Sequence, residues 1–200
     1  MKNGGDGHGL PRREITDSRF PLSPAALGVD GAAVLKVAVA VLATALAAQV
    51  KVPALGSPVP ITLQTLAVLL TGFALGAHLA PAAMLAYLVL GAFGLPLFAV
   101  GGFGPTGGYI VGFVFAAAFV GNFGQGGRGS WPRTAAVAAA GTGIIFATGL
   151  IWLTAWLHGD GLAAWRIGGL PFWPGELLKT AVAVAAVQAW RRSGGGFRGG

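Results

Sequence analysis

The sequence predicts an all-α integral membrane protein with six transmembrane helices. Hydrophobic residues make up 54% of the 200 positions and charged residues only 10%, whereas a soluble domain carries about a quarter charged residues. The apolar residues gather in six runs, which are separated by short stretches of Gly, Pro and charge. Most of these runs are long enough to cross the hydrocarbon core of a bilayer, so composition and spacing indicate the same fold class.

The six apolar runs define the predicted spans. With a rise of about 1.5 Å per residue, most of them form helices of roughly 25–36 Å, and the third is the shortest. The first run ends in Ala45-Leu46-Ala47 and also resembles a signal peptide; because five more spans follow, we expect it to be a retained helix. The runs are Ala32–Val50, Ile61–Ala77, Leu79–Phe93, Gly107–Phe123, Thr134–Leu157 and Pro174–Trp190.

The flanking regions differ from the spans in composition. Residues 1–30 mix Gly, Pro and charge with few large apolar side chains, which predicts a flexible cytoplasmic tail. We expect residues 31–192 to form one six-helix membrane domain and residues 193–200 to form a tail of Gly and Arg.

The basic residues predict the orientation of the spans, because loops rich in Lys and Arg stay on the cytoplasmic side. Nine basic residues lie on the side that holds both termini and two on the other, with Lys36 and Lys179 left out because they fall inside spans. Both termini are therefore expected in the cytoplasm, and the loops Lys51–Pro60, Gly94–Thr106 and His158–Trp173 outside. The nine are Lys2, Arg12, Arg13, Arg19, Arg128, Arg133, Arg191, Arg192 and Arg198, and the two are Lys51 and Arg166.

Several function classes are disfavoured by what the sequence lacks. The net charge of +7 arises mostly from basic residues between apolar runs, not from a basic patch with interleaved aromatics, so we expect no nucleic-acid partner. There is no cysteine and the three histidines are scattered, so neither a metal site nor a catalytic residue is predicted. No G-x-x-x-x-G-K-[ST] sequence occurs, so no ATP site or cofactor is expected. Membrane lipid is the partner that the composition itself implies.

Glu176 and Lys179 stand three positions apart in the last apolar run. Each charge costs about 2.5–3.5 kcal/mol at membrane depth on insertion scales, and ionisable pairs in membranes usually face a bundle interior or a cavity. Alternatively, Glu176 suits the positive end of a helix that begins at Pro174, while Lys179 extends toward the interface. Spacing alone leaves both interpretations open.

The glycine-rich segment Gly101–Tyr109 leads into the fourth run. Part of it matches G-x-G-x-x-G, but the acidic residue that a dinucleotide site needs about 20 positions on is missing. Its glycines, Gly107 and Gly108 among them, permit close approach of the backbone to a neighbouring helix or to a ligand. For Thr106 and Tyr109, packing and ligand contact are equally compatible with the sequence.

Polar and aromatic side chains mark the outer ends of other spans. Gln64 both donates and accepts hydrogen bonds, so it either caps its own helix end or contacts a ligand. The aromatic residues around the last two spans fit an interfacial belt. These are Trp152, Trp156, Trp165, Phe172 and Trp173.

Taken in order, several motifs resemble one family. They are Val59-Pro-Ile-Thr-Leu-Gln64-Thr-Leu, Tyr87-Leu, Gly91-Ala-Phe-Gly-Leu-Pro96-Leu-Phe98, Gly104-Pro-Thr-Gly-Gly-Tyr109, and Pro171-Phe with Lys179. The family is BioY, the biotin-specific substrate-binding S component of energy-coupling factor (ECF) transporters, and the similarity runs from about Ala32 to Trp190. It implies an ECF S-component-like bundle in which residues 31–192 bind substrate in an outward-facing pocket closed by Lys51–Pro60.

The resemblance also implies a function. It implies high-affinity biotin binding and uptake across a bacterial-type cytoplasmic membrane by a multi-pass protein that is not an enzyme. A coupling transmembrane subunit and two ATPase subunits would supply the energy. Glu176 and Lys179 are implied as biotin contacts, although the family usually carries Asp at the first of these positions. The other expected contacts are Gln64, Phe98, Thr106, Gly107, Gly108, Tyr109 and Phe172.

Family members dock on the coupling subunit through an Ala-x-x-x-Ala face of the first helix. Ala43 with Ala47 fits this pattern, but Ala is abundant in the run, and Ala40, Thr44 and Ala48 form a rival stripe. Two other functions remain open at this point: an S component for another vitamin, and a membrane assembly protein whose charged pair faces a partner helix.

Overall fold

The computed structural model describes residues 30–54, 56–100, 103–125 and 130–194, and most of them are helical. The predicted tails 1–30 and 193–200 lie outside these residues, except for Asp30, Ser193 and Gly194. The elements are α1 (Gly31–Gln49), β1 (Lys51–Val52), β2 (Ile61–Thr62), α2 (Gln64–Ala92), α3 (Gly107–Gly124), α4 (Trp131–Trp156), α5 (Gly161–Ala164), the π-helical segment η2 (Trp165–Gly169), the 3₁₀ segment η3 (Leu170–Phe172) and α6 (Trp173–Arg192).

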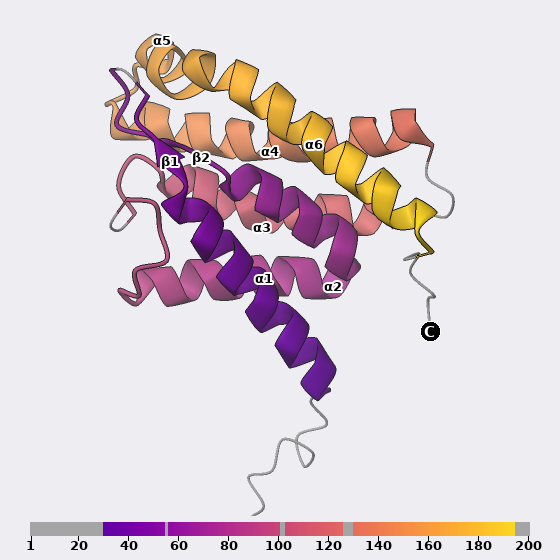
Figure 1. The fold of residues 1–200 in the computed structure, drawn as a ribbon. Helices are drawn as coiled ribbons and strands as arrows, with labels where there is room; N and C mark the ends of the chain where they lie inside the picture. The colour runs from indigo at the N-terminus through magenta and orange to yellow at the C-terminus, as the bar shows by residue number, and fades with distance from the viewer. Residues whose placement is uncertain (1–29, 55, 101–102, 126–129, 195–200) are drawn as a thin grey trace, which may run out of the picture.

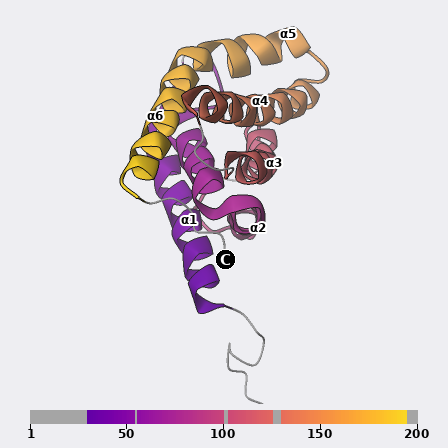
Figure 2. The same cartoon turned by 90° about the vertical axis from the view of Figure 1, so that its right-hand side faces the viewer.

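The long helices form one bundle in which most neighbours in sequence are also neighbours in space (Figure 1). α2 packs against α3, α3 against α4 and α1 against α2, while α6 contacts both α4 and α2. α1 extends past the other helices at its N-terminal end (Figure 2). β1 and β2 pair antiparallel with Lys51 opposite Thr62, so the chain forms a hairpin at the end of the bundle where α1 ends and α2 begins.

The second and third predicted spans, Ile61–Ala77 and Leu79–Phe93, fall largely within one element, α2, whose backbone breaks at Gly76. Gly76 has φ of 77°, a conformation that residues with a side chain rarely adopt, and the two arms of α2 turn back on each other there (Figure 1). The contact with α3 is also tight: a Cβ on Gly121 would lie 2.4 Å from the Gly76 carbonyl oxygen. Close packing and backbone conformation both favour glycine at this corner.

Four helices in the described part of the chain, α1, α2, α3 and α4, are long and apolar enough to cross a membrane by length and composition. α6 is not among them, since it holds Glu176 and Lys179 near its start and two arginines in its last turn. The all-helical fold class is confirmed, and α1, α3, α4 and α6 match the first, fourth, fifth and last predicted runs within a few residues.

The outward face of α1 is apolar, as contact with lipid requires. Leu35, Leu42 and Leu46 are 65%, 59% and 61% exposed, whereas Ala40, Thr44 and Ala48 on the opposite face are buried. In water, exposure of a patch of this kind would oppose folding, but in a bilayer the same side chains meet hydrocarbon. The exposure pattern therefore agrees with the membrane class.

The third predicted outer loop, His158–Trp173, contains helical turns that the sequence pattern did not reveal. Asp160 caps α5 by accepting a hydrogen bond from the Ala163 N–H at 2.8 Å, and η2 and η3 follow. Glycine and proline usually indicate irregular loops, and this stretch contains both. Here Gly168 serves packing instead, because a Cβ on it would lie 2.3 Å from Leu153 Cδ2 of α4.

Candidate functional site

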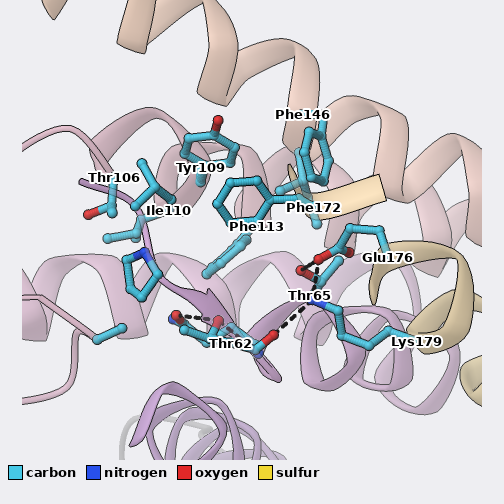
Figure 3. A pocket seen from close by; sticks show the side chains of 15 residues that line it. Thr62, Thr65, Thr106, Tyr109, Ile110, Phe113, Phe146, Phe172, Glu176 and Lys179 are labelled. Atoms are coloured by element: carbon cyan, nitrogen blue, oxygen red, sulfur yellow. Dashed lines mark hydrogen bonds and ion pairs between the residues drawn. The ribbon is translucent and has the colours of Figure 1, made fainter. Parts of the chain in front are cut away.

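A cavity lies near the end of the bundle that carries the β1–β2 hairpin (Figure 3). The empty space between its walls amounts to about 520 Å³, part of which is open to solvent at the mouth. Much of its wall is aliphatic or aromatic, and a small set of polar side chains faces it from several elements. The lining residues are Val59, Pro60, Thr62, Gln64, Thr65, Ala99, Thr106, Tyr109, Ile110, Phe113, Ile145, Phe146, Phe172, Glu176 and Lys179.

The two charged residues of this lining come from the start of α6. Glu176 is 5% exposed and Lys179 is 6% exposed, and their side chains form an ion pair (Figure 3). Thr65 Oγ1 donates to Glu176 Oε1 at 3.4 Å, and Lys179 Nζ donates to the carbonyl oxygen of Thr62 at 2.8 Å. Lys179 thus points into the bundle toward β2, and its side chain is buried there.

One oxygen of the Glu176 carboxylate is left without a partner. Oε2 is buried and accepts no hydrogen bond. Among the described residues, it is the only buried side-chain nitrogen or oxygen atom without a hydrogen-bond partner. An unsatisfied buried acceptor costs about 1–3 kcal/mol, and more when it is charged. Since Glu176 lines the cavity, a ligand that donates a hydrogen bond to Oε2 would remove this cost.

Aromatic rings from three elements form one wall of the cavity. Tyr109 of α3 meets Phe146 of α4 edge to face with ring centroids 5.8 Å apart, and Phe146 meets Phe172 at 6.2 Å. The hydroxyl of Tyr109 donates to the carbonyl oxygen of Gly168 at 2.8 Å. Tyr109 therefore offers its ring to the cavity, while its hydroxyl holds η2 against α3.

Gln64 and Thr106 also line the cavity, and both are buried. Gln64 is the first residue of α2, and its side chain does not cap that helix. Its Nε2 donates to the hydroxyl of Tyr87 at 2.8 Å, and its Oε1 accepts from Thr62 Oγ1 at 3.1 Å. The amide therefore belongs to a network beside the cavity.

Three of the expected contacts lie outside the cavity lining. Gly107 and Gly108 pack α3 against α4, since a Cβ on Gly108 would lie 2.1 Å from Trp152 Cβ and one on Gly107 2.9 Å from a carbon of the Trp152 ring. Phe98 packs on Tyr87 with ring centroids 5.5 Å apart. The structure thus brings together Gln64, Thr106, Tyr109, Phe172, Glu176 and Lys179, and it does not bring these three to the same wall.

Several residues of the lining carry no clear functional signal in the sequence. Thr62 and Thr65 flank Gln64 within the motif that begins at Val59, and they contact Lys179 and Glu176. Threonine in an apolar run is ordinary in membrane helices, so residue type gave no signal. Their proximity to Gln64 within one motif was the available hint. Phe113 and Phe146 carried no signal beyond their apolarity.

A second cavity lies on another side of Glu176, between α4 and α6. The empty space between its walls amounts to about 530 Å³, part of it open to solvent, and it shares Phe146 and Glu176 with the first. Apart from Glu176, its polar side chains are Thr142, Thr180 and the indole of Trp173, and the two threonine hydroxyls hydrogen-bond each other at 3.0 Å. Glu176 lines both cavities, but Lys179 lines the first and not the second, so the first is the better candidate site.

On α1, the two stripes of small residues face different ways. Ala40, Thr44 and Ala48 are buried, and Thr44 Oγ1 lies 4.0 Å from Met84 Sδ of α2. Ala43 is exposed and Ala47 is half-buried. The rival stripe is thus occupied by packing within the protein, which leaves Ala43 on the outer side.

The helices and this cavity define a helical membrane protein with a cavity beside a hairpin at one end of the bundle. Its fold is similar to the crystal structure of the S component for biotin from an ECF-type ABC transporter, with a TM-score of 0.67, 24% sequence identity, and coverage of 82% of this chain and 94% of that one.

The family follows from the sequence. The BioY family model matches residues 23–195, and the chain belongs to this family. It is 39% identical to the biotin transporter BioY of Thermotoga maritima over 132 residues, which cover 63% of this chain and 77% of that protein. It is 37% identical to the probable biotin transporter BioY of Pyrococcus horikoshii over 158 residues, which cover 76% of this chain and 91% of that protein.

Proposed function

We propose that this protein captures biotin with high affinity and takes part in its uptake, as the substrate-binding S component of an ECF transporter. Membership of the BioY family and the S-component fold support this function, and they make the protein a transporter component and not an enzyme. The observation that carries the proposal is the buried Glu176–Lys179 pair, which lines the cavity and in which Glu176 Oε2 has no hydrogen-bond partner.

The chemistry of biotin matches these groups. Its ureido ring has two N–H donors and a carbonyl acceptor, its fused rings are apolar, and its tail ends in a carboxylate. Glu176 Oε2 accepts from a ureido N–H, and Lys179 donates to the ureido carbonyl or to the carboxylate. Tyr109, Phe146 and Phe172 pack against the rings. Phe98, Gly107 and Gly108 contribute by shaping the bundle around the site.

The chain crosses a bacterial-type cytoplasmic membrane six times, with both termini in the cytoplasm. The arms of α2 on either side of Gly76 make two crossings, and α6 makes the last one. This orientation is supported by Arg133, Arg191 and Arg192, which lie at the end of the bundle opposite the hairpin. A reporter fused after Gly200 is expected to be active in the cytoplasm, and activity restricted to the outside would overturn the orientation.

Energy for uptake comes from partners, because the sequence has no P-loop motif. The partners are a coupling transmembrane subunit and two ATPase subunits. The exposed Ala43 and the half-buried Ala47 of α1 provide a small-residue contact for the coupling subunit. The family resemblance and this exposure support the assignment.

Purification in mild detergent, followed by mass spectrometry of the small molecules that copurify, tests the function. Biotin is the expected ligand, and calorimetric titration of the ligand-free protein with biotin should give saturable binding. Competition with unlabelled vitamins checks the specificity. Displacement of biotin by another vitamin at lower concentration would indicate an S component for that vitamin, and no small-molecule binding would favour an assembly protein.

A further inference from the structure

Tyr87 lies behind the cavity wall and is fully buried. A chain of three hydrogen bonds, two of which involve Tyr87, connects Leu97 with Thr62. The Tyr87 hydroxyl donates to the carbonyl oxygen of Leu97 at 2.8 Å, Gln64 Nε2 donates to the Tyr87 oxygen at 2.8 Å, and Thr62 Oγ1 donates to Gln64 Oε1 at 3.1 Å. Gln64 and Thr62 line the cavity, whereas Tyr87 does not.

The direction of these bonds follows from the hydrogens that are available. A carbonyl oxygen only accepts, so the single hydroxyl hydrogen of Tyr87 goes to Leu97. The Tyr87 oxygen must then accept a hydrogen from Gln64, which turns the amide nitrogen of Gln64 toward Tyr87. The amide oxygen is consequently on the Thr62 side, and it has a second lone pair beyond the one that Thr62 uses.

We propose that Tyr87 is a positioning residue that makes Gln64 a hydrogen-bond acceptor for the ligand and thereby sets specificity for a cyclic urea. This inference rests on the proposed function. With the amide held in this way, Gln64 Oε1 and the free Glu176 Oε2 are two acceptors, and the ammonium of Lys179 is a donor. A cyclic urea offers the complementary set of two N–H donors and one carbonyl acceptor.

Without the Tyr87 hydroxyl, the Gln64 amide is free to turn. The NH₂ group of Gln64 would then face the ligand. A ligand N–H that had donated to Gln64 Oε1 would instead meet another N–H donor. A mismatch of this kind discriminates strongly in buried sites, because it leaves polar groups unpaired. Tyr87 therefore acts on the ligand through Gln64.

Tyr87→Phe isolates the hydroxyl from the ring. The ring packs on Phe98 at 5.5 Å and on Phe113 at 6.4 Å between centroids, and phenylalanine keeps both contacts. The hydroxyl also holds the carbonyl of Leu97, so a loss of biotin affinity alone would not separate positioning of Gln64 from support of the loop after α2. A comparison of variants is needed.

The experiment measures the Kd of purified protein for biotin in detergent in wild type, Tyr87→Phe, Gln64→Ala and the double variant. We expect Tyr87→Phe to weaken binding about three- to tenfold, as loss of one buried hydrogen bond does, and to have no further effect when Gln64 is already Ala. Gln64→Glu provides a rescue: a carboxylate has two equivalent acceptor oxygens, so Tyr87→Phe in that background should change Kd less than twofold.

The binding measurements distinguish action of the Tyr87 hydroxyl through Gln64 from action through Leu97 and from no role in binding. An equal loss from Tyr87→Phe in the wild-type and Gln64→Ala backgrounds would show that the hydroxyl acts through Leu97, and it would overturn the inference while the biotin function stands. Unchanged binding by Tyr87→Phe would overturn it as well. A wild-type protein that binds no biotin would instead overturn the proposed function, and the inference with it.

Discussion

Lys179 Nζ donates a hydrogen bond to the carbonyl oxygen of Thr62 at 2.8 Å, although 117 positions separate the two residues in the chain. The bond joins the start of α6 to strand β2 of the hairpin beside the cavity. The same ammonium is paired with Glu176. The Lys179 ammonium thus joins the hairpin to α6, and a ligand bound to this ammonium would contact the same junction.

Replacement of Lys179 tests the importance of this group. Lys179→Ala should weaken biotin binding about tenfold or more, because hydrogen bonds to charged groups contribute roughly 1.5–3 kcal/mol and Glu176 would be left without its counter-ion. Isothermal titration of purified protein measures the change. Lys36→Ala is the matched control, since Lys36 is an exposed lysine within α1, and it should leave Kd unchanged. Equal affinity of Lys179→Ala and wild type would remove Lys179 from the site.

The charge and length of residue 176 are tested separately. Glu176→Gln should weaken biotin binding about tenfold, because an amide accepts hydrogen bonds less strongly than a carboxylate and can present a donor to the ligand. Glu176→Asp keeps the acceptor but withdraws it by about 1.5 Å, one carbon–carbon bond, so its Kd should lie between those of Glu176→Gln and wild type. If Glu176→Gln binds as tightly as wild type, the carboxylate is not a ligand contact.

The stability of a Gly108→Ala variant tests the packing of α3 on α4. A Cβ at this position would lie 2.1 Å from Trp152 Cβ and 2.6 Å from the Thr148 carbonyl oxygen, so Gly108→Ala should destabilise the protein by about 1–3 kcal/mol. Gly143→Ala in α4 is the control, because nothing lies within 4 Å of a Cβ there. Thermal unfolding in detergent should show a lower Tm for Gly108→Ala alone. Similar melting of the two variants would contradict the close helix contact.

Arg191 ties helices together at the end opposite the hairpin. Its guanidinium donates to Thr134 Oγ1 at 3.0 Å and to the carbonyl oxygen of Gly124, and it lies over the ring of Phe73. Arg191→Met should lower the free energy of unfolding by about 1–3 kcal/mol and leave the Kd for biotin unchanged.

Arg192→Met is the control for this position, because Arg192 lies over Trp131, which is 47% exposed, and such contacts contribute about 0.5–1 kcal/mol. Detergent melting curves and biotin titrations of both variants check the two expectations. A larger loss of stability in Arg192→Met, or weaker biotin binding in Arg191→Met, would contradict this assignment.

The helices could be predicted because the bilayer leaves few alternatives. Backbone groups in hydrocarbon must be paired within the chain, so an apolar run of sufficient length predicts a helix almost by itself. α1, α3, α4 and α6 follow this rule. The helical turns of α5, η2 and η3 could not be predicted in this way. Their Gly and Pro residues locally favour a loop, and packing against α4 overrides that preference.

The sequence predicted those site residues whose side chains are energetically unfavourable in an apolar helix. Glu176 and Lys179 stand out because charge within an apolar run needs compensation. Thr62 and Thr65 do not stand out. Thr62 meets Lys179 through its backbone carbonyl, a group that every residue carries, and the partner of the Thr65 hydroxyl lies 111 positions away in the chain. Gly107 and Gly108 illustrate the opposite case. The sequence allowed ligand contact or packing, and the structure has them against Trp152.

The sequence by itself determined the membrane class, most of the helix positions, the charged pair and the family resemblance, because each depends on the cost of polar groups in lipid or on motifs read in order. Only the tertiary structure decided which groups meet at the cavity, how Tyr87 orients Gln64, and that one oxygen of Glu176 lacks a partner. These features depend on contacts between distant segments. Helix packing sets those contacts, and no local pattern encodes them.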